Sequence, residues 1–244
     1  MAKTDSTGSV IDCACVIHST GYSWEYVERL YNMIQRNMPW EVRMHVYTEN
    51  QRHVPAPYIK HTLKEWKGIG GPKRSWWYKM QLFNPEFHQG PLLYFDLDCV
   101  IARDLSWILT HSPKYFWAIH DFKHLQNPNV QTLNSSVMWW DTREFADVWR
   151  TFTEQNIDDV IRQFPGDQDY LTRAIEYNRR RFFPDSYFES YRWQVLDGGY
   201  DFAKRRHKQP GAGAVITGDT SVIVFHGQPK PDQVQDPLIT QLWV

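Results

Sequence analysis

The stretch that decides the fold is Leu92-Leu93-Tyr94-Phe95-Asp96-Leu97-Asp98-Cys99-Val100-Ile101, an apolar run that carries two carboxylates. An apolar run of this length is typical of a buried strand, and charges do not stand at a strand end without partners. Because side chains alternate along a strand, we expect Asp96 and Asp98 to point to the same side where the strand gives way to a loop. A hard divalent cation such as Mg²⁺ or Mn²⁺ would relieve their repulsion. The pattern therefore predicts half of a metal site.

The segments on either side alternate between strand and helix patterns. Residues 10–17 and 42–48 are strand-like, and between them Ser23 is a candidate cap for a helix with apolar residues at spacings of three and four. A strand-helix-strand unit favours a parallel sheet with helices on its faces. Further strands are expected at 115–120, 135–140 and 221–225, and further helices at 73–83, 144–155 and 167–177. We therefore predict an α/β fold with a mostly parallel central sheet flanked by helices.

The organisation of the chain is predicted to be simple. Its 244 residues are enough for one large domain, and the sequence shows no internal repeat or convincing linker. We expect a flexible N-terminus over residues 1–9 and a single domain over residues 10–244. The first residues are polar and lack a signal core, and no run approaches the ~20 apolar residues of a membrane span.

Charge and cysteine content restrict the function classes. The 27 Lys and Arg nearly balance the 28 Asp and Glu, which gives no global attraction to nucleic acid. Basic clusters at 179–181 and 204–208 would allow peripheral membrane contact, steering an anionic or lipid-linked molecule. Cys13 and Cys15 are too close in an extended segment for an unstrained disulfide, and Cys99 makes the number odd. A reducing, cytoplasmic location is the expectation.

A second group of polar residues follows the last predicted strand, in His226-Gly227-Gln228-Pro229-Lys230-Pro231. Strand ends line the ligand crevice of an open α/β sheet, so His226 is a candidate third metal ligand. Gly227 allows close backbone approach, and Lys230 is placed to reach a phosphate as a point charge. Together with Asp96 and Asp98, these residues describe a cation bound to a diphosphate.

The order of these motifs resembles that of retaining glycosyltransferases similar to glycosyltransferase family 8. The resemblance covers most of the chain and rests on four segments: Leu92 to Asp98 with its D-x-D, Asn134-Ser135-Ser136-Val137, Gly166-Asp167-Gln168-Asp169-Tyr170-Leu171, and the final H-G-x-x-K-P. It implies a single glycosyltransferase-A type domain, a nucleotide-sugar donor, most simply a UDP-sugar, and Mn²⁺ or Mg²⁺ as cofactor.

The resemblance also implies roles for individual residues. Asp98 and His226 would be direct metal ligands, and Asp96 a ligand that also touches the ribose side of the donor. Gly227 and Lys230 would hold the diphosphate. The loop after the first strand would bind the base and ribose, through Ser19, Thr20, Gly21 and Tyr22.

The sugar end of the donor is assigned in the same way. Asn134 and Ser135 would line the sugar pocket, Asp167 would hydrogen-bond sugar hydroxyls, and Gln168 would face the anomeric carbon. Lys79 stands where the family usually has an Arg, and it lacks the bidentate geometry of a guanidinium. Ser136 likewise replaces a common Gly.

The prediction is a hexosyltransferase-type enzyme that transfers a sugar to a hydroxyl acceptor with retention, by front-face attack. Its catalytic residues would be Asp167, Gln168 and Lys230. Phe95 to Asp98 also resembles the nucleophile motif of haloacid-dehalogenase-type phosphatases, with Asp96 as the nucleophile. A non-catalytic protein that binds nucleotide-sugars or glycans is a third possibility.

Overall fold

The computed structural model describes residues 9–19, 21–67, 69 and 74–244. Residues 1–8 of the predicted flexible N-terminus, and Thr20 of the predicted donor loop, lie outside the described residues. A seven-stranded central sheet has the strand order β3-β2-β1-β4-β7-β6-β8. Its strands are β1 (Val10–Ile17), β2 (Glu41–Thr48), β3 (Ile59–Thr62), β4 (Pro91–Phe95), β6 (Phe116–His120), β7 (Leu133–Asp141) and β8 (Arg180–Phe182).

The central sheet is mostly parallel, as the sequence predicts. β3, β2, β1 and β4 pair in parallel, and so do β6 and β8. Only β7, among the strands of this sheet that the structure describes, runs in the opposite direction, between β4 and β6. Nine consecutive residues of β7, Leu133 to Asp141, are buried, as expected for a central strand covered on both faces.

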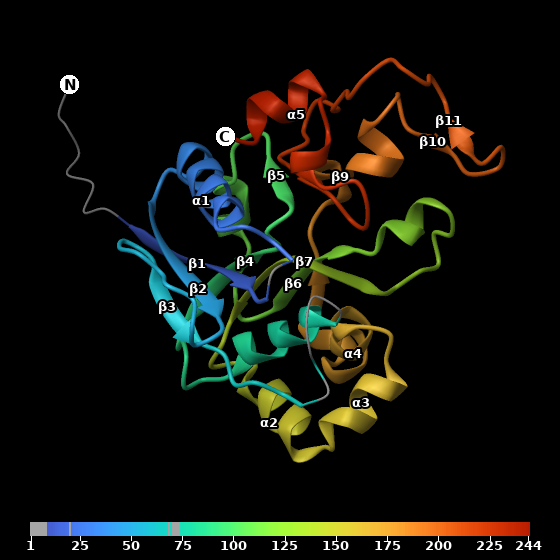
Figure 1. Cartoon of the computed structure of the whole chain (residues 1–244). Coiled ribbons are helices and arrows are strands. Elements are labelled where there is room, and N and C mark those ends of the chain that lie inside the picture. Colours follow the sequence, from blue (N-terminus) through green and yellow to red (C-terminus); the bar gives the residue numbers. More distant parts are fainter. Residues whose placement is uncertain (1–8, 20, 68, 70–73) are drawn as a thin grey trace.

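Helices cover both faces of this sheet. Figure 1 shows α1 and α5 above it and α2, α3 and α4 below it. The α-helices are α1 (Glu25–Asn37), α2 (Ala146–Glu154), α3 (Ile157–Gln163), α4 (Asp167–Ala174) and α5 (Pro237–Leu242). Short 3₁₀ turns are η1 (Ser75–Phe83), η2 (Ser106–Thr110), η3 (Phe122–Leu125), η4 (Tyr177–Arg179), η5 (Asp185–Tyr187) and η7 (Pro231–Gln233), and η6 (Tyr191–Val195) is a π turn.

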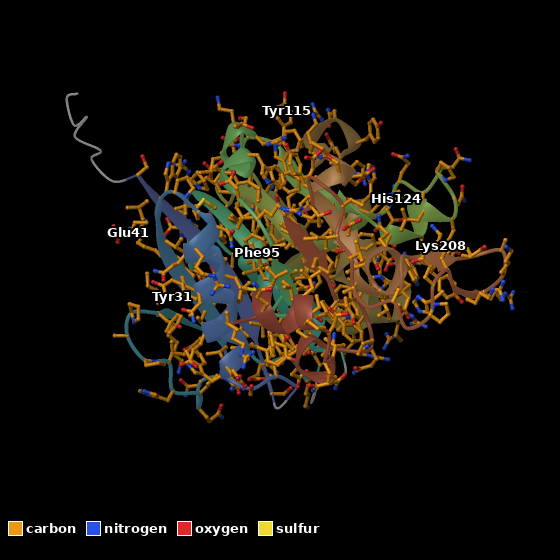
Figure 2. The ribbon with its side chains drawn as sticks, turned by 90° about the horizontal axis from the view of Figure 1, so that it is seen from above. Tyr31, Glu41, Phe95, Tyr115, His124 and Lys208 are labelled. Atoms are coloured by element: carbon orange, nitrogen blue, oxygen red, sulfur yellow. The ribbon has the colours of Figure 1, made fainter. Side chains whose placement is uncertain are left out.

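Two hydrophobic cores fill the space between the layers. Val27, Leu30 and Ile34 of α1 pack into the upper core, so the apolar spacing of this helix predicts its buried face correctly. The lower core lies between the sheet, η1 and α2, where Trp77 stacks against Phe152 at 6.2 Å between ring centroids. In Figure 2, Phe95 at the end of β4 lies near the middle of the molecule, whereas Lys208 lies at its edge.

The helix predicted over 73–83 differs from the observed segment. Lys73 lies outside the described residues, and Ser75–Phe83 forms a 3₁₀ helix instead of an amphipathic α-helix. Seven consecutive residues from Trp77 to Phe83 are buried, including Lys79 and Gln81. Because Trp77 to Phe83 is enclosed on all sides while Trp76 is 41% exposed, a pattern read as one apolar face does not describe the segment.

The last strand, β12 (Val222–Val224), does not join the central sheet. It forms a second sheet of order β5-β12-β9, with β5 (Cys99–Ile101) and β9 (Phe188–Ser190). A small hairpin pairs β10 (Tyr200–Asp201) with β11 (Arg206–His207). The inference that His226 ends a strand of the main sheet is therefore wrong, although its strand does lead to the same region.

Two properties bear on the expected cellular context. Cys13, Cys15 and Cys99 are buried free thiols, and the absence of a Cys13–Cys15 disulfide agrees with the sequence prediction. Within the described part of the chain, no helix combines the length and the apolar character needed to cross a membrane. The cytoplasmic location stays a prediction.

Candidate active site

The two carboxylates of the D-x-D motif lie in a turn, not in a strand as their spacing suggests. β4 ends at Phe95, and the backbone N–H of Cys99 donates to the carbonyl of Asp96 at 3.1 Å, which closes a turn before β5. The backbone N–H of Asp96 donates to the carbonyl of Ser136 at 2.8 Å. Both carboxylates face one pocket because of this turn, and strand alternation is not the reason.

Strand pairing explains how distant motifs reach this turn. Since β7 runs opposite to β4, its first residues, Asn134 and Ser135, lie at the edge where β4 ends. In the second sheet, Val224 of β12 pairs with Cys99 of β5 in antiparallel register. The chain leaving β12 therefore passes beside Asp98, and this brings His226 to Lys230 to the pocket.

The pocket has a volume of about 820 Å³, within the range of small-molecule sites. It gathers nearly all of the predicted site residues. Among the described ones it is lined by Gly21, Tyr22, Lys79, Asp96, Asp98, Asn134, Ser135, Asp167, Gln168, His226, Gly227 and Lys230. Ser19 is not among the lining residues, and its backbone carbonyl accepts a hydrogen bond from Arg52 at 2.5 Å.

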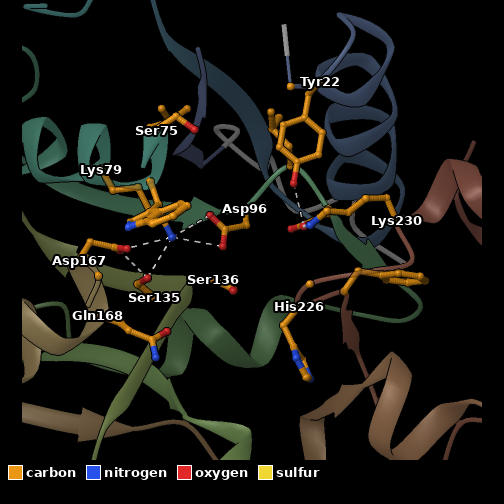
Figure 3. A pocket seen from close by; sticks show the side chains of 18 of the residues that line it. Tyr22, Ser75, Lys79, Asp96, Ser135, Ser136, Asp167, Gln168, His226 and Lys230 are labelled. Carbon is orange, nitrogen blue, oxygen red and sulfur yellow. Dashed lines mark hydrogen bonds and ion pairs between the residues drawn. The ribbon is translucent and has the colours of Figure 1, made fainter. Parts of the chain in front are cut away.

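Lys79 is the centre of a buried polar network (Figure 3). Its Nζ lies 3.0 Å from Oδ1 of Asp96 and 3.4 Å from Oδ2 of Asp167, and it donates to Oγ of Ser135 at 2.9 Å. Ser135 in turn donates to Asp167 at 2.6 Å. One ammonium therefore holds residues of η1, β7 and α4 against the D-x-D turn.

Burial of these groups shifts their proton affinities. Burial alone would lower the pKa of Lys79, but the carboxylates of Asp167 and Asp96 raise it above its usual value. Burial would likewise raise the pKa of Asp96, but Lys79 and a 2.6 Å hydrogen bond from Tyr94 hold it below its usual value. Lys79 therefore stays charged and Asp96 stays a carboxylate.

Asp98 has a different set of partners. Its carboxylate forms an ion pair with Lys230, and the Tyr22 hydroxyl donates to its Oδ2 at 2.9 Å. Burial raises the pKa of Asp98, and repulsion from Asp96 adds to this against the opposing charge of Lys230. Two carboxylates with opposite pKa shifts in one pocket are typical of a functional site.

His226 lies near this pair but is directed elsewhere. Figure 3 shows its imidazole pointing away from Asp96. Its Nε2 lies 2.6 Å from Oγ of Ser190, and its ring stacks on Phe122 at 5.4 Å between centroids. Burial lowers its pKa to about 4, so the imidazole is neutral and has the protonation state of a metal ligand. Its role as a ligand stays a prediction.

Sequence reasoning missed the partner of Gln168. The Gln168 amide donates to Oδ2 of Asp121 at 3.1 Å, and Asp121 is 6% exposed. Asp121 directly follows β6, which is parallel to β4, so its carboxylate stands at the same edge of the sheet as Asp96. The rule that selected Asp96, a carboxylate at the end of an apolar strand, would also have selected Asp121.

The basic cluster at 179–181 is partly used by the fold. Arg179 pairs with Asp147 at 2.7 Å, and the guanidinium of Arg181 lies 4.0 Å from the ring centroid of Tyr115. In the cluster at 204–208, Lys204 lies 3.7 Å from Asp201. Contact with a membrane or an anionic acceptor stays a prediction for both clusters.

Comparison with known proteins identifies the fold. Neither a scan against protein-family models nor a search of curated proteins finds a match. Among solved structures, the galactosyltransferase LgtC in complex with donor and acceptor sugar analogues superposes with a TM-score of 0.63 at 12% identity, covering 96% of this chain and 97% of that one.

Two other structures agree. The glycosyltransferase GlyE of Streptococcus pneumoniae gives a TM-score of 0.64 at 14% identity over 96% of this chain and 60% of GlyE. Mouse xyloside xylosyltransferase 1 gives 0.57 at 10% identity over 91% of this chain and 100% of that one. At such identities the likeness establishes the fold alone. The chain is an α/β protein of the glycosyltransferase-A type, which takes away the fold-level support for the phosphatase alternative.

Proposed function

We propose that this protein is a metal-dependent, retaining glycosyltransferase resembling glycosyltransferase family 8, which transfers a sugar from a nucleotide-sugar, a UDP-sugar, to a hydroxyl acceptor. The observation that carries the proposal is the pocket in which Asp96 and Asp98 face two lysines, Lys79 and Lys230, at the carboxyl ends of β1 and β4. The glycosyltransferase-A type fold of the chain supports it.

The carboxylate pair fits a hard divalent cation. Asp96 and Asp98 offer oxygen ligands on one turn, and each already contacts a cationic ammonium, so both favour positive charge. Asp96 and Asp98 would hold Mn²⁺ or Mg²⁺, and His226 would join them only after its imidazole turns away from Ser190. When bound, the metal supplies charge stabilisation for a departing diphosphate.

Lys230 is the residue assigned to the leaving group. Its ammonium pairs with Asp98 of the D-x-D turn. The lysine side chain is flexible, so the ammonium can move to a bound phosphate. As the bond between the anomeric carbon and the phosphate oxygen breaks, negative charge grows on the β-phosphate, and Lys230 stabilises it.

Lys79 and Asp167 are assigned to the sugar. Asp167 lies 3.4 Å from Lys79 and accepts from Ser135, which leaves its remaining lone pairs for sugar hydroxyls. Gln168, held by Asp121, would face the anomeric carbon. In front-face attack, the acceptor oxygen bonds to this carbon on the side from which the phosphate leaves, and the hydroxyl proton passes to the departing phosphate oxygen. An inverted product would contradict this mechanism.

Donor hydrolysis tests the proposal. Nucleotide-sugars are screened for release of the nucleoside diphosphate with and without Mn²⁺. We expect Mn²⁺-dependent release from a UDP-sugar, and a loss of at least about 100-fold in Asp98→Asn. Asp219→Asn, an exposed carboxylate outside the pocket, is the matched control and should keep the full rate. Equal rates in the parent and Asp98→Asn would reject the site, and donor binding without turnover would favour a non-catalytic binding protein.

A further inference from the structure

A second group of metal-ligating side chains lies away from the pocket, on the same parallel strands. Asp12 is near the amino end of β1, His45 is in β2, and His88 precedes the amino end of β4. One ligand atom from each of the three lies within 4.8 Å of the other two. At about 3.3 Å per residue, Asp12 stands roughly 16 Å from the carboxyl end of β1, where the pocket begins.

The local contacts orient these side chains toward one another. Nε2 of His45 lies 2.8 Å from Oδ1 of Asp12, and the rings of His45 and His88 are 5.0 Å apart between centroids. His45 is buried, whereas Asp12 and His88 are partly exposed, so an ion can enter from solvent. In a tetrahedral zinc site the ligand atoms are roughly 3.3 Å apart, and small side-chain rotations reach that spacing from the observed one.

The outer contacts resemble those that support metal ligands. Nδ1 of His45 lies 2.8 Å from Nε2 of His61, so His45 can bind a metal through Nε2 while its other ring nitrogen has a hydrogen-bond partner. His61 is itself fixed by stacking on Tyr47 at 4.5 Å. Arg43 binds both oxygens of Asp12, at 2.8 and 2.7 Å, and holds the carboxylate in place.

The type of ligand selects the metal. Two imidazoles and one carboxylate favour a borderline ion such as Zn²⁺, whereas Mg²⁺ and Ca²⁺ prefer sites made of oxygen alone. We propose that Asp12, His45 and His88 together bind one Zn²⁺ ion, which ties β1 and β2 to the segment that enters β4. Water completes the coordination at the partly exposed side. The proposal is independent of the glycosyltransferase function.

Cobalt substitution tests this site directly, because Co²⁺ in a tetrahedral zinc site absorbs visible light. The protein used is the untagged full chain with Asp98→Asn, called the parent in this experiment. The substitution reduces Co²⁺ binding by the D-x-D carboxylates. We expect one Co²⁺ per chain with a tetrahedral spectrum that Zn²⁺ abolishes. A parent protein that shows no such spectrum at millimolar Co²⁺ would overturn the proposal.

Variants assign the spectrum to the three residues. His88→Gln should weaken Co²⁺ binding by more than about 100-fold, since it removes a direct ligand. Asp12→Asn keeps the side-chain volume and should cause a loss of the same kind, which covers the case in which His88→Gln does not fold. His53→Gln, an exposed histidine outside the group, should bind like the parent. If His88→Gln and Asp12→Asn also bind like the parent, the assignment is wrong.

Discussion

At the carboxyl ends of β1 and β4, two lysines face three carboxylates, whereas toward the amino ends of the same strands one carboxylate lies beside two imidazoles, with a third imidazole behind them. The first group consists of ammonium and carboxylate groups, which suit hard anions and hard cations. The second consists of imidazoles and one carboxylate that Arg43 holds, a ligand set that suits a borderline metal ion. The two ends of the same pair of strands thus carry different kinds of side chain and suit different ligands.

The difference predicts how the two ends respond to loss of a partner. A buried charge left without its counter-ion is costly. Lys79, Asp98 and Asp167 at the carboxyl end are buried, whereas Asp12 and His88 at the amino end are partly exposed. The carboxyl end should therefore be the place where single substitutions destabilise the chain most. The amino end should gain stability from an added ion.

The largest effect is expected from Lys79→Met. Removing this ammonium leaves the buried Asp167 and the partly buried Asp96 without their cation, which should lower the free energy of unfolding by roughly 3–5 kcal/mol. Urea denaturation measures the change, provided that the dependence of the unfolding free energy on urea concentration (the m-value) is the same in both proteins. Arg162→Ala, in an exposed pair with Asp159, is the control and should stay within about 0.5 kcal/mol. A cost near that of the control would show that the Lys79 network is not a stabilising one.

Lys230→Met should have the next largest effect, on rate instead of stability. If Lys230 stabilises the departing diphosphate, its loss should lower Mn²⁺-dependent donor turnover by about 10²–10³-fold. Lys114→Met, at an exposed position outside the pocket, should retain the parent rate. If Lys230→Met retained more than a tenth of that rate, Lys230 would act only as the partner of Asp98.

Zinc should stabilise the folded chain through the amino end. At 100 times the dissociation constant, a ligand that binds only the folded state adds about 2.7 kcal/mol, which for this size of chain raises Tm by roughly 5–10 °C. Thermal unfolding with Zn²⁺ against Mg²⁺ measures the gain. His88→Gln should abolish the gain and His53→Gln should keep it. An equal gain in His88→Gln would place the bound zinc elsewhere.

The two ends also differ in how far the sequence predicts them. The carboxyl-end residues occur in short local motifs, such as Asp96 with Asp98 and Asp167 with Gln168, at element ends that apolar patterns reveal. Asp12, His45 and His88 lie far apart in the sequence, and only the register of β1, β2 and β4 brings them together. A local pattern carries no information on that register.

The errors at the carboxyl end have two origins, one local and one long-range. The period of two placed Asp96 and Asp98 on one side of a strand, but a backbone hydrogen bond from Cys99 folds them into a turn. The apolar run ending at Phe225 predicts a strand correctly, yet whether it joins the central sheet depends on its pairing with β5 and β9. Element types follow from local patterns, whereas sheet membership follows from long-range pairing.

The smallest effects are expected from two substitutions that each remove one supporting hydrogen bond, one at each end. These two substitutions give the strictest comparison of the two ends. Tyr22→Phe deletes the hydroxyl that donates to Asp98, and His61→Phe deletes the partner of His45 while keeping a ring to stack on Tyr47. Loss of an outer contact weakens a metal site by about 10–100-fold. Tyr22→Phe should therefore raise the Mn²⁺ concentration needed for donor turnover by about tenfold without changing Co²⁺ affinity at the amino end.

His61→Phe should do the opposite and weaken Co²⁺ binding by about tenfold. Both quantities are measured on both variants, with Tyr177→Phe, a residue that is 75% exposed, as the control that should change neither. Each supporting hydrogen bond is made to a different metal ligand. Tyr22→Phe should therefore leave Co²⁺ affinity unchanged, and His61→Phe should leave the Mn²⁺ requirement unchanged. A change in Co²⁺ affinity caused by Tyr22→Phe would mean that β1 and β4 transmit the state of one end to the other, and the two groups would then have to be treated as one coupled system.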